Sequence, residues 1–174
     1  IGDESPIVTV QIDITDLNEM KRLTYIATDV TNTVLTIDNA NFVVDMAGLP
    51  LAFNAATTTA CSVLTPDSIA PTLTAADVDM DTSVLTLTFS ETVDSSTIDP
   101  TRFIFIDADS GTQTYQLTGA NSKGASGAIV AIGLTTLDMN TIKKNTALLT
   151  GSIDSYIYSE AGVVAFEDMA ANDA

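Results

Sequence analysis

The chain has 174 residues, of which 23 are acidic and six are basic, and it contains no histidine, no tryptophan and one cysteine. The missing histidine excludes Ser-His-Asp, Cys-His and histidine–zinc chemistry within these residues, so we expect no enzyme and no catalytic residue. The formal net charge of −17 argues against nucleic acid and anionic lipid surfaces as partners and makes cations the natural ones. Hydrophobic residues make up 45% of the chain, enough for a folded core, and no apolar run approaches the ~18 residues of a membrane-spanning helix.

The N-terminal region predicts a strand followed by a short helix. Apolar and polar residues alternate from Val8 to Ile14, the period expected of a strand with one face on a core. Residues 16–23 then predict a helix, because Asp16 and Glu19 have capping-box spacing and two cations end the segment. Further strands are predicted at 33–38 and 42–45.

A linker and a second run of strands follow. Cys61 has no intrachain partner, so it is either a buried or idle thiol or is paired outside the chain. Residues 66–71 have the proline and small-polar composition of a linker. Apolar residues alternate with threonines over 83–90, which predicts a strand half-buried against a core. Other strands are predicted at 72–79, 102–107, 113–118, 128–135, 154–159 and 163–167.

An internal repeat organises these elements. The pattern of residues 7–22 returns in residues 129–144 at an offset of 122, and Asp45-Met46-Ala47 returns at Asp168 at an offset of 123. Residues 1–65 are therefore interpreted as the C-terminal half of one module, 66–71 as the linker and 72–174 as a second, nearly complete module. A longer parent protein with many such units is the simplest explanation. The paired cations at the end of both helices are interpreted as helix termination in preference to a binding role.

Two motifs suggest a family. The segment from Ala70-Pro71-Thr72-Leu73 to Leu87-Thr88-Phe89-Ser90-Glu91-Thr92-Val93-Asp94 resembles the start of immunoglobulin-like repeats in very large secreted surface proteins of bacteria and algae. Those repeats close on an Asp-x-Ala-Gly-Asn turn, from which the turns at Asp45 and Asp168 each depart at one position. The resemblance implies an all-β fold of tandem immunoglobulin-like β-sandwich modules with one short helix each. It also implies an extracellular location in a surface layer, adhesive fibre or filament.

Carboxylates supply the candidate metal ligands. Asp107 and Asp109 stand two residues apart before Gly111, as the first ligands of a calcium-binding loop do. The remaining residues of such a loop, including its distal glutamate, are absent from the sequence that follows. Asp77, Asp79 and Asp81 would share one side of an extended segment. An ion held by such hard oxygen ligands would be Ca²⁺, and solvated turn aspartates are the alternative. Asp45 and Asp168 are further candidates, as ligands between modules near the linker.

Three classes of function follow, ranked as structural repeat, adhesin and enzyme. The structural repeat would self-associate through its modules, because a half-module of residues 1–65 exposes apolar strand faces that upstream residues or another copy of the chain must cover. The adhesin would bind a cell-surface or glycan ligand with calcium, although Tyr156 and Tyr158 form only a small stripe that suits packing between modules. The enzyme would depend on Glu91 and Asp94, an acidic pair expected by chance in so acidic a chain.

Overall fold

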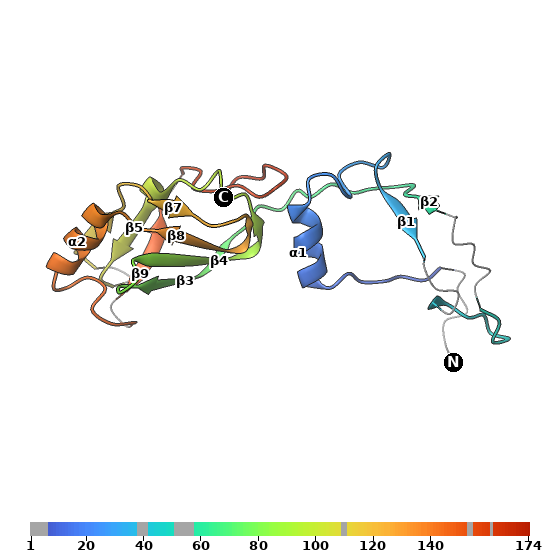
Figure 1. The fold of residues 1–174 in the computed structure, drawn as a ribbon, viewed down its shortest axis with the longest axis horizontal. Helices are drawn as coiled ribbons and strands as arrows, with labels where there is room; N and C mark the ends of the chain where they lie inside the picture. Colours follow the sequence, from blue (N-terminus) through green and yellow to red (C-terminus); the bar gives the residue numbers. More distant parts are fainter. Residues whose placement is uncertain (1–6, 38–41, 51–57, 109–110, 153–154, 161) are drawn as a thin grey trace. The chain divides into compact units, whose positions relative to one another are not determined.

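The computed structural model describes residues 7–37, 42–50, 58–108, 111–152, 155–160 and 162–174. The chain divides into two compact units (Figure 1). The larger unit combines Ile1–Arg22 with Ser68–Ala174, and the smaller unit is Leu23–Asp67. The first helix therefore belongs with the second module of the sequence, whereas the predicted division placed all of residues 1–65 together.

Two antiparallel sheets form the larger unit. One has the strand order β3-β4-β8-β7 and the other the order β6-β5-β9. Its elements are α1 (Ile14–Arg22), β3 (Leu73–Asp79), β4 (Val84–Val93), η2 (Pro100–Arg102), β5 (Phe103–Ile106), β6 (Thr114–Gln116), β7 (Ser122–Lys123), β8 (Gly127–Gly133), α2 (Thr136–Lys144) and β9 (Tyr156–Ser159).

Both sheets contribute to one hydrophobic core. Alternate residues of β4 are buried, as the period of two predicts, and β8 and β5 bury their own alternate residues against them. Phe166 joins the two sheets, because its ring lies 4.7 Å from that of Phe89 on β4 and 6.4 Å from that of Phe103 on β5. The buried strand residues of this core are Leu85, Leu87, Phe89, Val93, Phe103, Phe105, Val130 and Ile132. The prediction of an all-β fold is confirmed.

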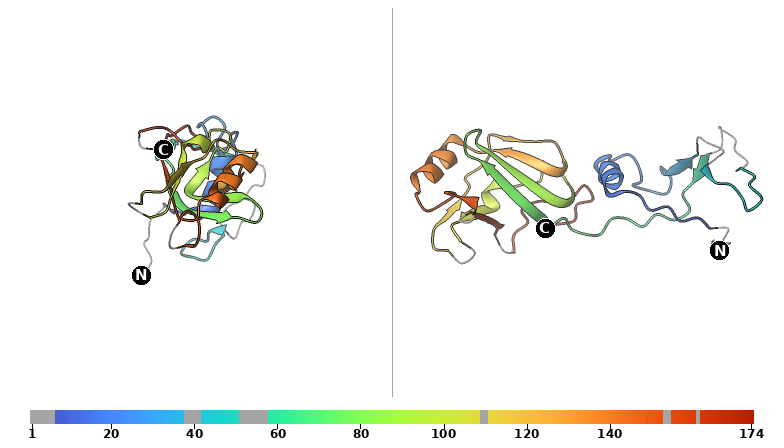
Figure 2. Two further views of the ribbon diagram at one scale, coloured as in Figure 1. Left: turned by 90° about the vertical axis from the view of Figure 1, so that its left-hand side faces the viewer. Right: turned by 90° about the horizontal axis from the view of Figure 1, so that it is seen from below.

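Helix α2 closes one end of the two sheets (Figure 2). Thr135 caps it by accepting a 3.0 Å hydrogen bond from the amide of Asp138, and Met139 and Ile142 are buried in the core. Lys143 and Lys144 form its last turn, where cations are favoured by the helix dipole.

The smaller unit is a two-stranded antiparallel sheet with long connections. Strand β1 (Val34–Thr36) pairs with β2 (Thr58–Ala60), so that Val34 lies opposite Ala60. All three residues of β1 are exposed. A two-stranded sheet without a covered face is at best marginally stable.

Two sequence predictions for the N-terminal region are wrong. Residues 7–13 form no strand, because a strand needs a ladder partner and the strand that pairs with the equivalent residues of the second copy, β4, is already paired with β8. The first helix begins at Ile14, and Asp13, not Asp16, accepts from the amide of Thr15 at 2.9 Å. Glu19 instead pairs with Arg22 one turn later.

The repeat is present in the backbone. Helices α1 and α2 have nine residues each and start at equivalent positions, as do β1 and β9. Ala27 and Leu149, one repeat apart, both have positive φ angles, 54° and 55°. Matching irregular features of this kind indicate that the two copies have the same local fold.

Candidate functional site

The end of strand β4 combines buried polar groups with a helix. Glu91 and Thr92 are 6% and 1% exposed, although both are polar. Lys21 of α1 donates to the Glu91 carboxylate, and the Thr92 hydroxyl donates to the main-chain carbonyl of Asn18 at 2.8 Å. A buried carboxylate is stable only when it is paired, so α1 supplies what the end of β4 requires.

The closing turn at Asp168 lies beside the same end of β4. Val93 forms a β-bridge with Asp168, and the amide of Asp94 donates to the carbonyl of Glu167 at 3.0 Å. Asp168 is buried and accepts from the amides of Ala170 and Asn172, both at 2.8 Å. The Asn172 side chain adds a third bond at 2.7 Å.

The first copy builds the same turn. The Asp45 carboxylate accepts from the amides two and four residues later, Ala47 and Leu49, both at 2.8 Å. Gly48 and Ala171 occupy the same place in the two turns with φ angles of 78° and 63°. The left-handed conformation suits Gly48, whereas Ala171 adopts it at some cost in strain. These contacts assign Asp45 and Asp168 to turn formation.

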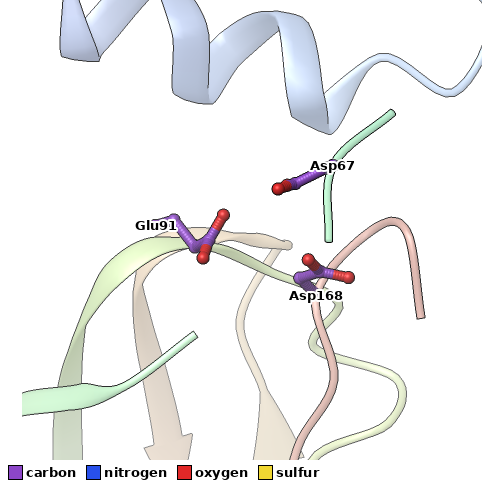
Figure 3. Close-up of side chains that lie close together, drawn as sticks. All are labelled: Asp67, Glu91 and Asp168. Atoms are coloured by element: carbon purple, nitrogen blue, oxygen red, sulfur yellow. The ribbon is translucent and has the colours of Figure 1, made fainter. Parts of the chain in front are cut away.

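Glu91 and Asp168 bring two carboxylates together. One oxygen of each lies within 4.8 Å of the other, and Figure 3 draws both side chains with that of Asp67. Glu91 and Asp168 both belong to the larger unit, and Asp67 belongs to the smaller one. Hard oxygen ligands of this kind could hold Ca²⁺, but the ammonium group of Lys21 already pairs with Glu91, so that an ion would compete with it.

A second buried carboxylate lies at the start of α2. Asp138 is fully buried and its Oδ1 accepts from the Tyr115 hydroxyl at 2.8 Å and from the Thr118 hydroxyl and amide at 2.8 and 3.1 Å. Burial pushes the pKa of Asp138 upward, but hydrogen bonds from Thr135, Tyr115 and Thr118 outweigh it and lower the pKa below the usual 3.8. Ionised Asp138 therefore links the start of α2 to Tyr115 on β6 and to Thr118 just after that strand.

An open groove of about 500 Å³ lies on the larger unit. Ala76, Asp77 and Val78 of β3 line one part of it, and Tyr156 and Ile157 of β9 line another. These are edge strands of the two sheets, so the groove is the open side between them.

The predicted metal ligands form two separate clusters along the sequence, one at Asp77, Asp79 and Asp81 and one at Asp107 and Asp109. Asp77 and Asp79 are exposed on β3, and Asp81 lies in the following turn, where its amide donates to the Asp79 carboxylate at 2.8 Å. The Asp107 carboxylate accepts from the amide of Gln113 across the β5–β6 hairpin at 3.3 Å, while Asp109 lies outside the described residues. Among the residues that the structure describes, the acidic group with metal-like spacing includes none of these five. Calcium binding by them stays a prediction.

The remaining candidates have local partners. Glu91 pairs with Lys21, and Asp94 accepts from the amide of Ser96 at 2.8 Å, so each carboxylate has a structural contact. Tyr156 and Tyr158 are both exposed on β9. Cys61 is half-buried and its thiol lies 2.9 Å from the carbonyl of Val63.

Sequence reasoning considered Glu91 and Asp168 but did not bring them together. Glu91 was paired with Asp94 because the two stand three residues apart, and Asp168 was considered only with Asp45, as a ligand between modules near the linker. A signal was present in the repeat: Lys21, whose side chain pairs with Glu91, recurs unchanged as Lys143.

Comparisons with protein-family models, curated proteins and solved structures found no match to this chain. No helix among the described residues is both long and apolar enough to cross a lipid bilayer.

Proposed function

We propose that the chain is a structural repeat of a large extracellular filament, surface coat or adhesive fibre, built from immunoglobulin-like β-sandwich modules in tandem. One observation carries this proposal: the residues that the first copy exposes are the residues that the second copy buries. Val8, Val10 and Ile12 are 61%, 64% and 46% exposed, whereas their equivalents Val130, Ile132 and Leu134 are 0%, 0% and 2% exposed.

The helix of the first copy shows the same difference. Leu17 and Met20 are half-buried, but their equivalents Met139 and Ile142 belong to the hydrophobic core. Asp16 is exposed, whereas its equivalent Asp138 is buried with hydrogen bonds from groups near β6. The first copy thus has the apolar face of a module without the strands that cover it.

The covering strands come from a front half equivalent to residues 68–126. Within the described residues, the front half of the second module pairs with its own back half, β4 with β8 and β5 with β9. A further front half would cover the first copy, supplied by a neighbouring repeat of the same polypeptide or by another copy of the chain.

An extended array suits the charge of the chain. A formal charge of −17 keeps modules soluble and apart, while ladder hydrogen bonds and apolar burial within each module do not depend on it. Repeats that contact only their neighbours can extend without a limit set by a closed surface.

Antibodies raised against the chain test the extracellular role. Applied to intact, unpermeabilised cells of the source organism and to their shed filaments, they should label the outer surface at regular intervals. Labelling only after permeabilisation would contradict the proposal, and an antibody to a cytosolic protein serves as the control for cell integrity.

A calcium-dependent adhesin is the second candidate. The open groove between β3 and β9 favours it, because Asp77 and Tyr156 face a space of about 500 Å³ that a small polar ligand could enter. Glycan-array binding that Ca²⁺ strengthens and Tyr156→Ala removes would support this function. No Ca²⁺ binding at millimolar concentration by calorimetry, with an unchanged melting temperature in chelator, would remove the calcium hypothesis.

A further inference from the structure

Helix α1 belongs to the first copy of the repeat but contacts strand β4 of the second module. Its Asn18 carbonyl accepts from Thr92 and its Lys21 pairs with Glu91, so that one turn of helix covers the polar end of β4. The Lys21 and Glu91 side chains keep 22% and 8% of their surface exposed, which makes this a largely buried ion pair. A contact of this kind between consecutive repeats defines a junction.

Helix α2 carries the same residues on the same face. Asn140 and Lys143 stand where α1 has Asn18 and Lys21, and both are exposed. Met139 and Ile142 fix α2 in the core, and Asn140 and Lys143, each one residue further along the helix, lie on an adjacent face that is exposed. Figures 1 and 2 show α2 at one end of the two sheets. Within the part of the chain that the structure describes, no ion pair involves Lys143.

We infer that this face of α2 is a docking surface for the β4 end of a following repeat, whose equivalents of Glu91 and Thr92 would meet Lys143 and Asn140. The inference rests on the proposed tandem array and names its junction. The chemistry is selective because a buried carboxylate at the end of β4 requires a cation. Four of the six cations of the chain lie at the ends of the two helices.

Lys144 provides a matched control. Its equivalent Arg22 pairs with Glu19 of its own helix, with 2.6 Å between the Arg22 Nη2 and Glu19 Oε1 atoms. Lys143 and Lys144 are both exposed neighbours in the last turn of α2, so a change at either has the same effect on helix termination. Only Lys143 is expected to contact the following repeat.

The test uses an extended chain in which residues 52–174 follow residue 174, since residue 51 and residue 174 are equivalent at the offset of 123. Lys143→Glu in the first segment should lower the urea midpoint of the extended chain by about 1 M, while Lys144→Glu should not. Replacing Glu91 by Lys in the added segment should restore most of the loss. In the 174-residue chain, Lys143→Glu and Lys144→Glu should have the same urea midpoint.

Equal midpoints for the two variants in the extended chain would overturn the inference. Lys21→Glu in the 174-residue chain distinguishes a failure of the α2 docking surface from a failure of the proposed tandem array. If Lys21→Glu destabilises and Lys143→Glu does not, only the docking surface is wrong; if neither does, the junction of the proposed array fails as well. Self-association of the 174-residue chain that Lys143→Glu abolishes would assign the face to a second copy and contradict the inference.

Discussion

Truncating one valine in each copy distinguishes a covered module from an uncovered one. Val8 and Val130 are equivalent positions with the same side chain, one in each copy of the repeat. Val130 lies on β8 and is 0% exposed, whereas Val8 is 61% exposed. The change to alanine removes the same atoms at both positions, so a difference in effect measures the surroundings alone.

The expected magnitude follows from burial. Valine to alanine removes two carbon groups, worth about 0.8 kcal/mol each when fully buried, and the cavity left in a close-packed core adds to this. Val130→Ala should therefore lower the free energy of unfolding by about 2–3 kcal/mol. Val8→Ala should change it by no more than ~0.5 kcal/mol, as is usual for an exposed side chain.

Urea unfolding followed by far-UV circular dichroism measures both changes, since the chain has no tryptophan for fluorescence. With an m value of about 1–3 kcal/mol per M, Val130→Ala should move the midpoint of the larger unit by about 1–2 M. Equal losses from the two variants would show that Val8 is already buried in the 174-residue chain, and the reasoning about an uncovered first copy would be refuted.

Three further predictions concern the buried carboxylates. Because the folded-state pKa of Asp138 lies below the usual 3.8, its stabilisation is present above that pH and is lost as the pH falls through the folded value. Asp138→Asn should therefore cost about 1–3 kcal/mol at neutral pH and make acid unfolding less steep; an unchanged pH profile would contradict this. Asp168→Ala should lower the stability of the larger unit by about 2–3 kcal/mol while Asp45→Ala leaves it unchanged, as thermal unfolding can show. Lys21→Ala should strengthen any Ca²⁺ binding by Glu91 and Asp168 in calorimetry, because it removes the competing ammonium group. Equal or weaker binding would show that these two carboxylates do not hold the ion.

Much of the second module, residues 72–174, could be predicted from its sequence. Alternating apolar residues located β3, β4, β5 and β8 to within a few residues, because one face of each strand packs on the core. The repeated pattern located both helices for a related reason, since the residues that recur are those that pack or cap. Strands β2 and β7 were not predicted, as short pairings leave little periodicity.

The N-terminal region shows where periodicity is insufficient. The pattern from Val8 to Ile14 is that of a strand, and its equivalent in the second copy is the strand β8. Alternation reports a face suited to burial, but a strand also needs a hydrogen-bonding neighbour, which lies elsewhere in the sequence. The pairing of Glu91 with Lys21 was hidden for the same reason, because 70 residues separate the two.

Amide hydrogen exchange of residues 8–12 tests the central claim, that a front half of the repeat completes the first copy. Residues 68–126 are fused directly before Ser5, which reproduces the natural junction between Ser126 and Gly127 at the offset of 122. These amides should exchange rapidly in the 174-residue chain and become protected in the fusion protein, as those of residues 130–134 are expected to be in both. A second fusion protein with Leu85 and Leu87 of the added segment changed to Lys should leave them unprotected. Rapid exchange in the intact fusion protein, or protection in the monomeric 174-residue chain, would contradict the account.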